Sequence, residues 1–233
     1  LIEYNDKIII PGLVDLHVHA PQYNFRSVGM DCELLEWLEK HAFPEEAKFS
    51  DTEYAEKAYS LFTEDLKTGY TRACIFGTLH KEASLILMEQ LEKSGLKTMV
   101  GKVNMDRNCP DYLCESSAEK SIAETIAFIE DSKKFKNTKP IITPRFIPSC
   151  TDELMYSLSE LVKKYNLPIQ SHLSENPSEI EWVKELCPFS TSYGNAYDRF
   201  GMLDNKTIMA HCVHMTDEEL KLMKDKNAFV AHC

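Results

Sequence analysis

The sequence predicts an α/β fold, a (β/α)8 barrel that lacks its last strand within these 233 residues. Short apolar runs alternate with longer amphipathic segments, which is typical of βα units repeated around a parallel sheet. Seven candidate strands occur, whereas a complete barrel has eight strands and ~250 residues. A doubly wound open sheet is the alternative fold. The GxGxxG and GxxxxGK[ST] motifs that would bind a nucleotide cofactor on such a sheet are absent from the sequence.

The strands are predicted where apolar residues run together between turn residues and helical segments. The first run ends in the sequence His-Val-His, and two later runs also end near a histidine. The seven predicted strands cover residues 7–18, 71–77, 97–103, 140–147, 168–173, 207–213 and 228–232.

Capping patterns mark where the helices between these strands begin and end. A Ser or Thr followed three residues later by Glu predicts a capping box, and a proline suits the first helical turn. A glycine just before a strand predicts a left-handed helix end. The boxes are Ser50 with Glu53, Ser116 with Glu119 and Thr216 with Glu219; Asn176 precedes Pro177 and Glu179; the glycines are Gly69 and Gly95.

The composition is that of an acidic globular protein. Lys and Arg number 26 against 37 Asp and Glu, which gives a net charge of −11, and 43% of the residues are hydrophobic. A nucleic-acid partner is not expected, because non-specific affinity for phosphates comes from clustered Lys and Arg. No membrane association is expected either, since no apolar run approaches the ~18 residues of a spanning helix.

The eight cysteines are scattered and form no CxxC pair. Cys109 and Cys114 lie close together, but without a second pair a zinc ribbon is disfavoured, and we expect reduced thiols. Reduced thiols and the absence of a secretory signal at the start of the sequence favour a cytoplasmic protein. The chain starts at Leu1 and stops inside an apolar run, so we expect residues 1–233 to be one barrel domain from a longer protein.

Four histidines at strand ends predict a metal site. His17 and His19 project to the same side of the first strand, because side chains alternate along a strand. His172 and His211 end two later strands, and in a closed barrel all four would meet at one mouth. Imidazoles without thiolate pairs favour zinc or another borderline divalent ion, ferrous iron included. Histidines bonded to loops are the structural alternative at each position.

Polar residues next to these strand ends are candidates for acid–base chemistry and ligand binding. Glu175, three residues after His172, could pass a proton between water and substrate; otherwise it is a loop or capping residue. Arg145 suits a planar acceptor, or it pairs with a carboxylate. Phe146 could face a ring. Gln22 offers both a donor and an acceptor.

Together these motifs resemble the guanine deaminases of the amidohydrolase superfamily. The resemblance runs along nearly the whole chain and rests on PGLVDLHVHAPQY from residue 11, LLEWL from residue 34, TPRF from residue 143, QSHLSE from residue 170 and MAH from residue 209. HxH is shared across the superfamily. The segments that point to guanine are APQY from residue 20, TPRF and QSHLSE.

The resemblance implies a TIM-type barrel that holds one zinc ion through His17, His19 and His172, with His211 on the metal or beside the water. It also implies an Asp ligand beyond residue 233 and a small β-sandwich domain, both outside this chain. Glu175 and His211 would be catalytic in the hydrolysis of guanine to xanthine and ammonia, and a homodimer is typical. The purine would lie against His19, Gln22, Arg145, Phe146, His172 and Glu175.

Two alternatives stay open from the sequence. One is a deaminase for another heterocycle, such as a pterin, a triazine or cytosine. The other is a barrel that binds a purine or a metal without chemistry. Both would keep the same histidines, so the sequence alone does not separate them.

Overall fold

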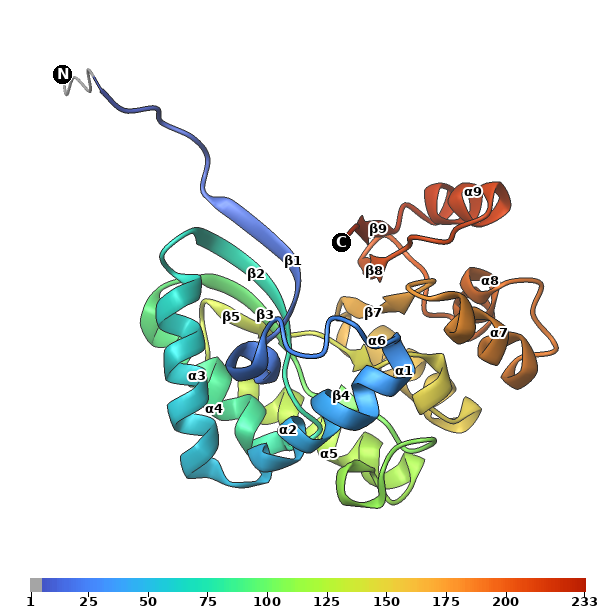
Figure 1. The fold of residues 1–233 in the computed structure, drawn as a ribbon, viewed down its shortest axis with the longest axis horizontal. Coiled ribbons are helices and arrows are strands. Elements are labelled where there is room, and N and C mark those ends of the chain that lie inside the picture. The colour runs from blue at the N-terminus through green and yellow to red at the C-terminus, as the bar shows by residue number, and fades with distance from the viewer. Residues whose placement is uncertain (1–5) are drawn as a thin grey trace.

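Parallel strands in chain order form the centre of the molecule, as a (β/α)8 barrel requires (Figure 1). The computed structural model describes residues 6–233. The first sheet pairs β1 (Leu13–His19), β2 (Tyr70–Phe76), β3 (Lys97–Gly101) and β5 (Thr138–Pro140). The second pairs β4 (Val103–Asn104) with β6 (Thr143–Pro144), and the third pairs β7 (Ile169–Leu173), β8 (Thr207–His211) and β9 (Phe229–Ala231). Within the described residues no pairing joins β9 to β1.

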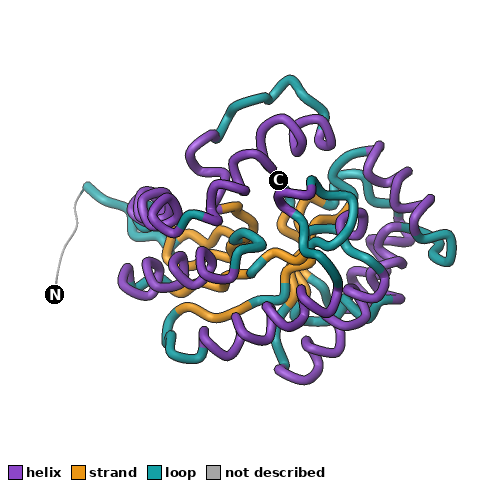
Figure 2. The backbone as a smooth tube through the Cα atoms, turned by 90° about the horizontal axis from the view of Figure 1, so that it is seen from below, coloured by secondary structure: helices purple, strands orange, loops and turns teal. Residues whose placement is uncertain are grey.

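Helices cover the outside of these strands (Figure 2). No helix within residues 6–233 is both long and apolar enough to cross a bilayer. The α-helices are α1 (Leu34–Trp37), α2 (Phe43–Ala47), α3 (Thr52–Leu66), α4 (Lys81–Ser94), α5 (Ala118–Ser132), α6 (Asp152–Tyr165), α7 (Pro177–Leu186), α8 (Tyr193–Arg199) and α9 (Asp217–Lys226). Short 3-10 or π segments are η1 (Ala20–Phe25), η2 (Leu38–Ala42), η3 (Lys48–Ser50), η4 (Asp111–Leu113) and η5 (Ile147–Ser149).

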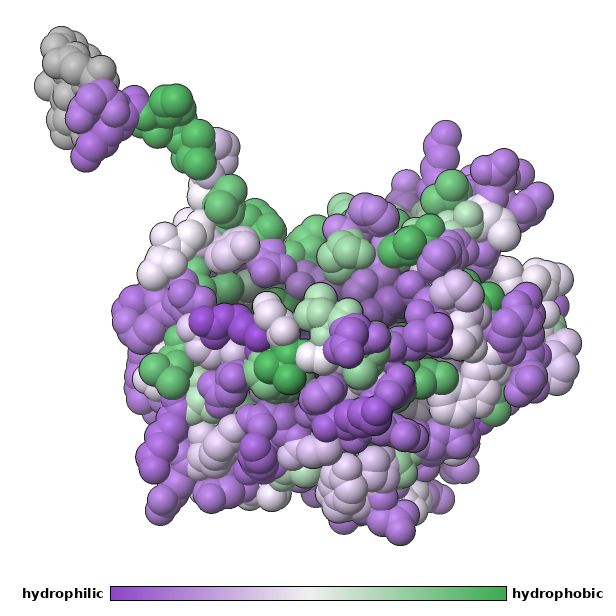
Figure 3. Space-filling view, viewed as in Figure 1, coloured by the Kyte–Doolittle hydropathy of each residue, from purple (hydrophilic) through white to green (hydrophobic). Residues whose placement is uncertain are grey.

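The first strand is shorter than predicted. It begins at Leu13 rather than at residue 7, and Ile8, Ile9 and Ile10 are 63–89% exposed. These residues extend from the body of the molecule as a hydrophobic arm (Figures 1 and 3). Among the described residues no strand pairs with the arm, so its apolar sequence is not sufficient to make it a strand.

Two predicted strands are each broken into two shorter ones. The segment 97–103 covers β3 and the first residue of β4, and the segment 140–147 covers only the last residue of β5 and the two residues of β6. Pro140 and Pro144 have no N–H to donate to a neighbouring strand, which limits regular pairing there. β8 also ends early, because His211 and Cys212 adopt left-handed conformations with φ of 72° and 54°.

Helix caps agree with the predictions at some positions and move by one residue at others. The capping boxes at Asn176 and Thr216 are confirmed, and Gly95 ends α4 with φ of 81°. Asp51 caps α3 and Ser117 caps α5, in place of Ser50 and Ser116, because the oxygens of those next residues reach the free N–H groups. The prediction of a cap at Gly69 is wrong: α3 ends at Leu66, and Lys67 is its C-cap.

The prediction that all cysteines are reduced is wrong for one pair. Cys109 and Cys114 form a disulfide, and their Cα atoms are 5.4 Å apart, within the range that a disulfide spans. The other six thiols are free, four of them buried. The two main cores lie under the two larger sheets: one between α3, α4 and the first sheet, the other between α6, α8 and β7.

Candidate active site

One pocket lies at the carboxyl ends of the strands, where a parallel barrel positions its functional groups. It brings together all eight site residues predicted from the sequence. Four histidines form one end of the pocket, called here the histidine end: His17, His19, His172 and His211. Gln22, Arg145, Phe146 and Glu175 line the rest, together with Leu34, Trp37 and Leu38.

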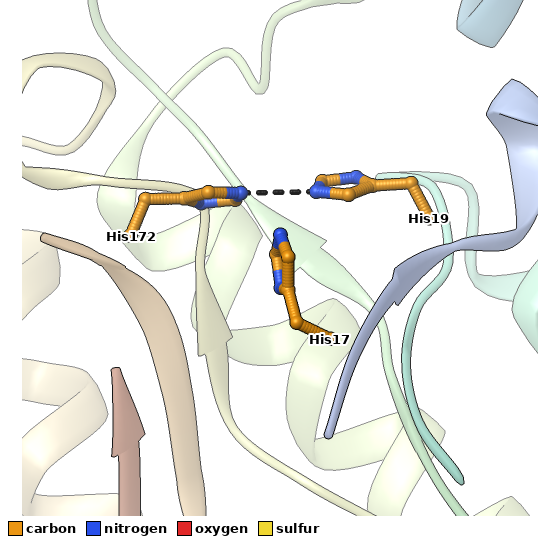
Figure 4. A group of neighbouring side chains, drawn as sticks. All are labelled: His17, His19 and His172. Atoms are coloured by element: carbon orange, nitrogen blue, oxygen red, sulfur yellow. Dashed lines mark hydrogen bonds between the residues drawn. The ribbon is translucent and has the colours of Figure 1, made fainter. Parts of the chain in front are cut away.

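Three of the histidines point their rings toward one point (Figure 4). His17 and His19 come from β1 and His172 from β7, and one ring nitrogen of each lies within 4.8 Å of the others. The Nε2 atoms of His19 and His172 are 2.9 Å apart. His172 Nδ1 donates to the carbonyl oxygen of Arg145 at 2.6 Å, so its Nε2 carries a lone pair directed at His19.

Burial keeps these rings neutral. It lowers the pKa of His17 to about 3, with a smaller effect from the charge of His211. Burial, followed by the charges of neighbouring histidines, holds the pKa of His19 and of His172 well below the usual range. Neutral imidazole is the form that binds a metal. The donor set of three converging nitrogens therefore fits a borderline divalent cation.

His211 lies beside this cluster at the end of β8. Its ring is 5.0 Å from that of His17 and stacks on His172 at 5.4 Å, measured between ring centroids. Its Nε2 is 3.4 Å from Glu175 Oε2, while its Nδ1 is 3.5 Å from Cys233 Sγ. His211 thus faces the carboxylate on one side, and burial lowers its pKa.

Glu175 is a largely buried carboxylate at the histidine end. Burial, reinforced by the charge of Glu179, raises its pKa to about 7, although Arg145 acts in the opposite direction. A group with this pKa can both accept and release a proton near neutral pH. The cap at the start of α7 is made instead by Asn176 and Glu179, so Glu175 is free of that role.

Two polar residues that line the pocket, Gln22 and Arg145, are joined by a buried carboxylate behind them, Glu46. These three residues are called here the polar wall. Arg145 is 2% exposed and forms two hydrogen bonds with Glu46, from Nη1 to Oε2 at 2.6 Å and from Nη2 to Oε1 at 3.0 Å. Gln22 Nε2 donates to Glu46 Oε1 at 3.3 Å. Arg145 therefore pairs with a carboxylate and also lines the pocket. That it binds a planar acceptor stays a prediction.

The sequence analysis missed Glu46 and the apolar lining. Glu46 lies in the five-residue helix α2 and is 1% exposed. No spacing rule distinguishes Glu46 from the neighbouring Glu45 in so short a helix. Trp37 is one of these apolar residues, and it lines the pocket from the end of α1. Within the described residues the other four histidines do not line this pocket.

Comparison with known proteins agrees with this geometry. The Amidohydrolase family matches residues 8–233. A curated guanine deaminase of Dictyostelium discoideum is 46% identical over 236 residues, which cover 100% of this chain and 52% of that protein. The guanine deaminase of Mus musculus is 45% identical, with 97% and 51% covered.

Solved structures agree in fold as well. A crystal structure of guanine deaminase from C. acetobutylicum with bound guanine superposes with a TM-score of 0.93 and 51% identity, covering 96% of this chain and 54% of that one. A triazine hydrolase at 18% identity shares the fold with a TM-score of 0.82. The chain spans about half the length of the curated relatives that it matches. With a barrel-type fold, a strand-end histidine cluster and a match over residues 8–233, the chain belongs to the amidohydrolase family.

Proposed function

We propose that the protein containing this chain is a guanine deaminase, which hydrolyses guanine to xanthine and ammonia. The observation that carries the proposal is the convergence of eight predicted residues on one pocket, in a chain similar to a structure with guanine in its active site. The pocket joins a metal-binding donor set, a carboxylate with a pKa of about 7 and a polar wall suited to a planar heterocycle. Each of these parts is needed for hydrolytic deamination.

We propose that the metal is zinc, one ion per chain, held by His17, His19 and His172. The converging neutral nitrogens support a borderline divalent ion, and an Asp ligand is expected beyond residue 233. When bound, zinc would supply Lewis acidity that lowers the pKa of water toward neutrality. His172 is held in its ligating tautomer by the carbonyl oxygen of Arg145, as the outer partners of metal-binding histidines usually do.

In this proposal Glu175 and His211 handle the protons. Glu175 accepts a proton from water and returns it to a ring nitrogen of guanine, which makes the amino-bearing carbon easier to attack. The 3.4 Å approach of its Oε2 to His211 Nε2 supports a joint role. His211 would orient the water and stabilise the charge that develops as ammonia leaves.

The purine would lie between the histidine end and the polar wall. Arg145 and Gln22 have the donors and the acceptor that the edge of guanine can use, and Phe146 offers a ring face. His19, His172 and Glu175 would contact the side of the ring that reacts. Residues 1–233 form one domain in this proposal.

The remaining features of the proposal are a homodimer in the cytoplasm and the absence of a nucleic-acid partner. The net charge of −11 supports the last of these, because like charges repel a phosphate backbone. Six free thiols support a reducing compartment.

The test is to measure ammonia release from guanine and the metal content of the same sample, using protein expressed from the complete reading frame. We expect about one zinc per chain, as four-coordinate catalytic sites hold, and turnover of guanine. Zinc without turnover of guanine would overturn the substrate and retain the hydrolase site. The absence of both would overturn the function.

A further inference from the structure

We propose that Glu46 is a positioning residue that fixes the orientation of both Gln22 and Arg145 toward a bound purine, and so determines which purines the pocket accepts. The inference rests on the proposed function for the identity of the ligand. Its structural basis is separate: Glu46 joins two pocket residues that come from distant parts of the chain, η1 and the segment after β6.

Glu46 is suited to this role because it is buried, and both of its oxygens are used. Its side chain is 1% exposed and that of Arg145 is 3% exposed. Oε2 accepts from Arg145 Nη1, while Oε1 accepts from Arg145 Nη2 and also from Gln22 Nε2. A two-point contact between a carboxylate and a guanidinium fixes the plane of the guanidinium as well as its position.

The pairing leaves a defined set of donors on Arg145. A guanidinium has five N–H groups, and the contact with Glu46 uses one on each terminal nitrogen. Glu46 is the only acceptor that the described residues offer to this guanidinium, and the ring of Phe43 lies 5.0 Å from its central carbon. The remaining N–H groups are available to an acceptor in the pocket.

Glu46 also determines which end of the Gln22 amide is free to bind a ligand. A carboxylate only accepts hydrogen bonds, so the Gln22 amide must turn its nitrogen toward Glu46. Its carbonyl oxygen receives no hydrogen bond from the described residues and is left to accept one from a ligand. Glu46 thereby makes Gln22 an acceptor and leaves Arg145 as the donor, which matches a heterocycle that presents both kinds of group.

The charge of Glu46 also affects whether the pocket binds a neutral or an anionic ligand. Together Glu46 and Arg145 form a neutral buried pair, so the wall has no net charge with which to attract an anion. Replacing the carboxylate by an amide would leave a buried, uncompensated guanidinium, which is unfavourable unless an anion pairs with it. The wall should therefore favour a neutral purine as long as Glu46 is present.

The experiment measures binding of guanine and of urate, a purine that is an anion near neutral pH, to the full-length protein by calorimetry. Every variant carries Glu175→Gln in addition, so that guanine is not consumed during the titration. In Glu46→Gln we expect guanine to bind about tenfold or more weakly, the size expected when a buried polar group loses its partner. The affinity for urate relative to the affinity for guanine should rise by a similar factor. Zinc content should stay at the wild-type value.

Glu115→Gln is the matched control. Glu115 forms the second buried pair of the described chain, with Lys102 Nζ at 2.5 Å, and the side chains are 4% and 0% exposed. It also accepts from the backbone N–H of Met105, and it does not line the site pocket. We expect a loss of thermal stability similar to that of Glu46→Gln, with the ratio of guanine to urate affinity unchanged.

An unchanged ratio of guanine to urate affinity in Glu46→Gln would overturn the inference. This holds whether both ligands weaken equally, which is the result of general loosening, or neither affinity changes. If Glu46→Gln does not fold, Glu46→Asp replaces it as the test, because aspartate keeps the charge but is one methylene shorter. Weaker guanine binding with retained zinc would support the inference. Guanine binding equal to that of the wild type would overturn it.

The binding measurement keeps the two proposals apart. A wild-type protein that binds guanine but releases no ammonia would overturn the proposed function while leaving the role of Glu46 testable. A protein that deaminates guanine with the same discrimination after Glu46→Gln would retain the function and overturn the role of Glu46.

Discussion

The two sides of the pocket are built by different means. The histidine end uses side chains carried directly by β1, β7 and β8, and each position follows from where its strand ends. The polar wall uses residues from η1, α2 and the segment after β6, which are held together by hydrogen bonds to one carboxylate. In a barrel, the strands can therefore carry the residues for metal chemistry, while the connections between the strands determine which ligand fits the pocket.

If this division is correct, the largest effects should come from the histidine end. We expect His19→Ala to reduce zinc to well under one ion per chain and to abolish turnover, because a catalytic zinc site depends on each of its few ligands. Elemental analysis and ammonia release are the measurements. His214→Ala, which changes a histidine outside the pocket, is the control. Full zinc occupancy in His19→Ala would contradict the division.

Glu175→Gln should separate chemistry from binding. Loss of a general acid–base group costs about 10²–10⁴-fold in kcat, whereas the amide has nearly the same shape, so KM should change little. Steady-state kinetics with guanine measures both constants. Glu160→Gln, on the exposed face of α6, should match the wild type. An unchanged kcat in Glu175→Gln would remove this residue from proton transfer.

Arg145→Ala should affect the wall and leave the metal in place. The substitution leaves Glu46 as a buried charge without its partner, which costs about 3–5 kcal/mol in the free energy of unfolding. We expect KM for guanine to rise at least tenfold, a loss of about 1.4 kcal/mol. Thermal unfolding, kinetics and zinc analysis on one preparation measure these effects. Loss of zinc would show that the two sides are not independent, and that the Arg145 carbonyl depends on its side chain.

Gln22→Ala should have the smallest effect of the four. Gln22 donates one 3.3 Å hydrogen bond to Glu46, and its amide is partly exposed. Removing one neutral hydrogen-bonding group costs about 0.5–1.5 kcal/mol, so KM should rise only a few-fold with stability nearly unchanged. The same kinetic and thermal measurements apply. A larger effect than that of Arg145→Ala would place recognition in Gln22 rather than in the charged pair.

The sequence predicted the histidine end better than the wall for a physical reason. Alternation along β1 puts His17 and His19 on one side, and parallel strand ends bring His172 and His211 to the same mouth. The first rule acts within one strand and the second follows from the predicted fold class, so a single sequence suffices. Convergence of Gln22 and Arg145 depended on a resemblance to a family, because no local rule joins them.

Two of the errors arise because the partner of a segment or a side chain lies elsewhere in the chain. The isoleucines at positions 8–10 have a strand-like sequence, but a strand also needs a partner, and pairing cannot be derived from one segment. Glu46 was missed because burial of an acid depends on a partner, Arg145, from another part of the chain. The breaks in the segment 140–147 could have been predicted, since Pro140 and Pro144 lack the N–H that regular pairing requires.

The pair between Glu46 and Arg145 also has a consequence for how the protein is made. The two residues are 99 positions apart, so on the ribosome Glu46 is synthesised long before its partner. Burying α2 early would place a lone carboxylate in the core, which is strongly unfavourable, and closing so long a loop adds an entropic cost. We therefore expect α2 to dock only after residue 145 has emerged, so that the polar wall forms after the strands β1 to β6 have been synthesised.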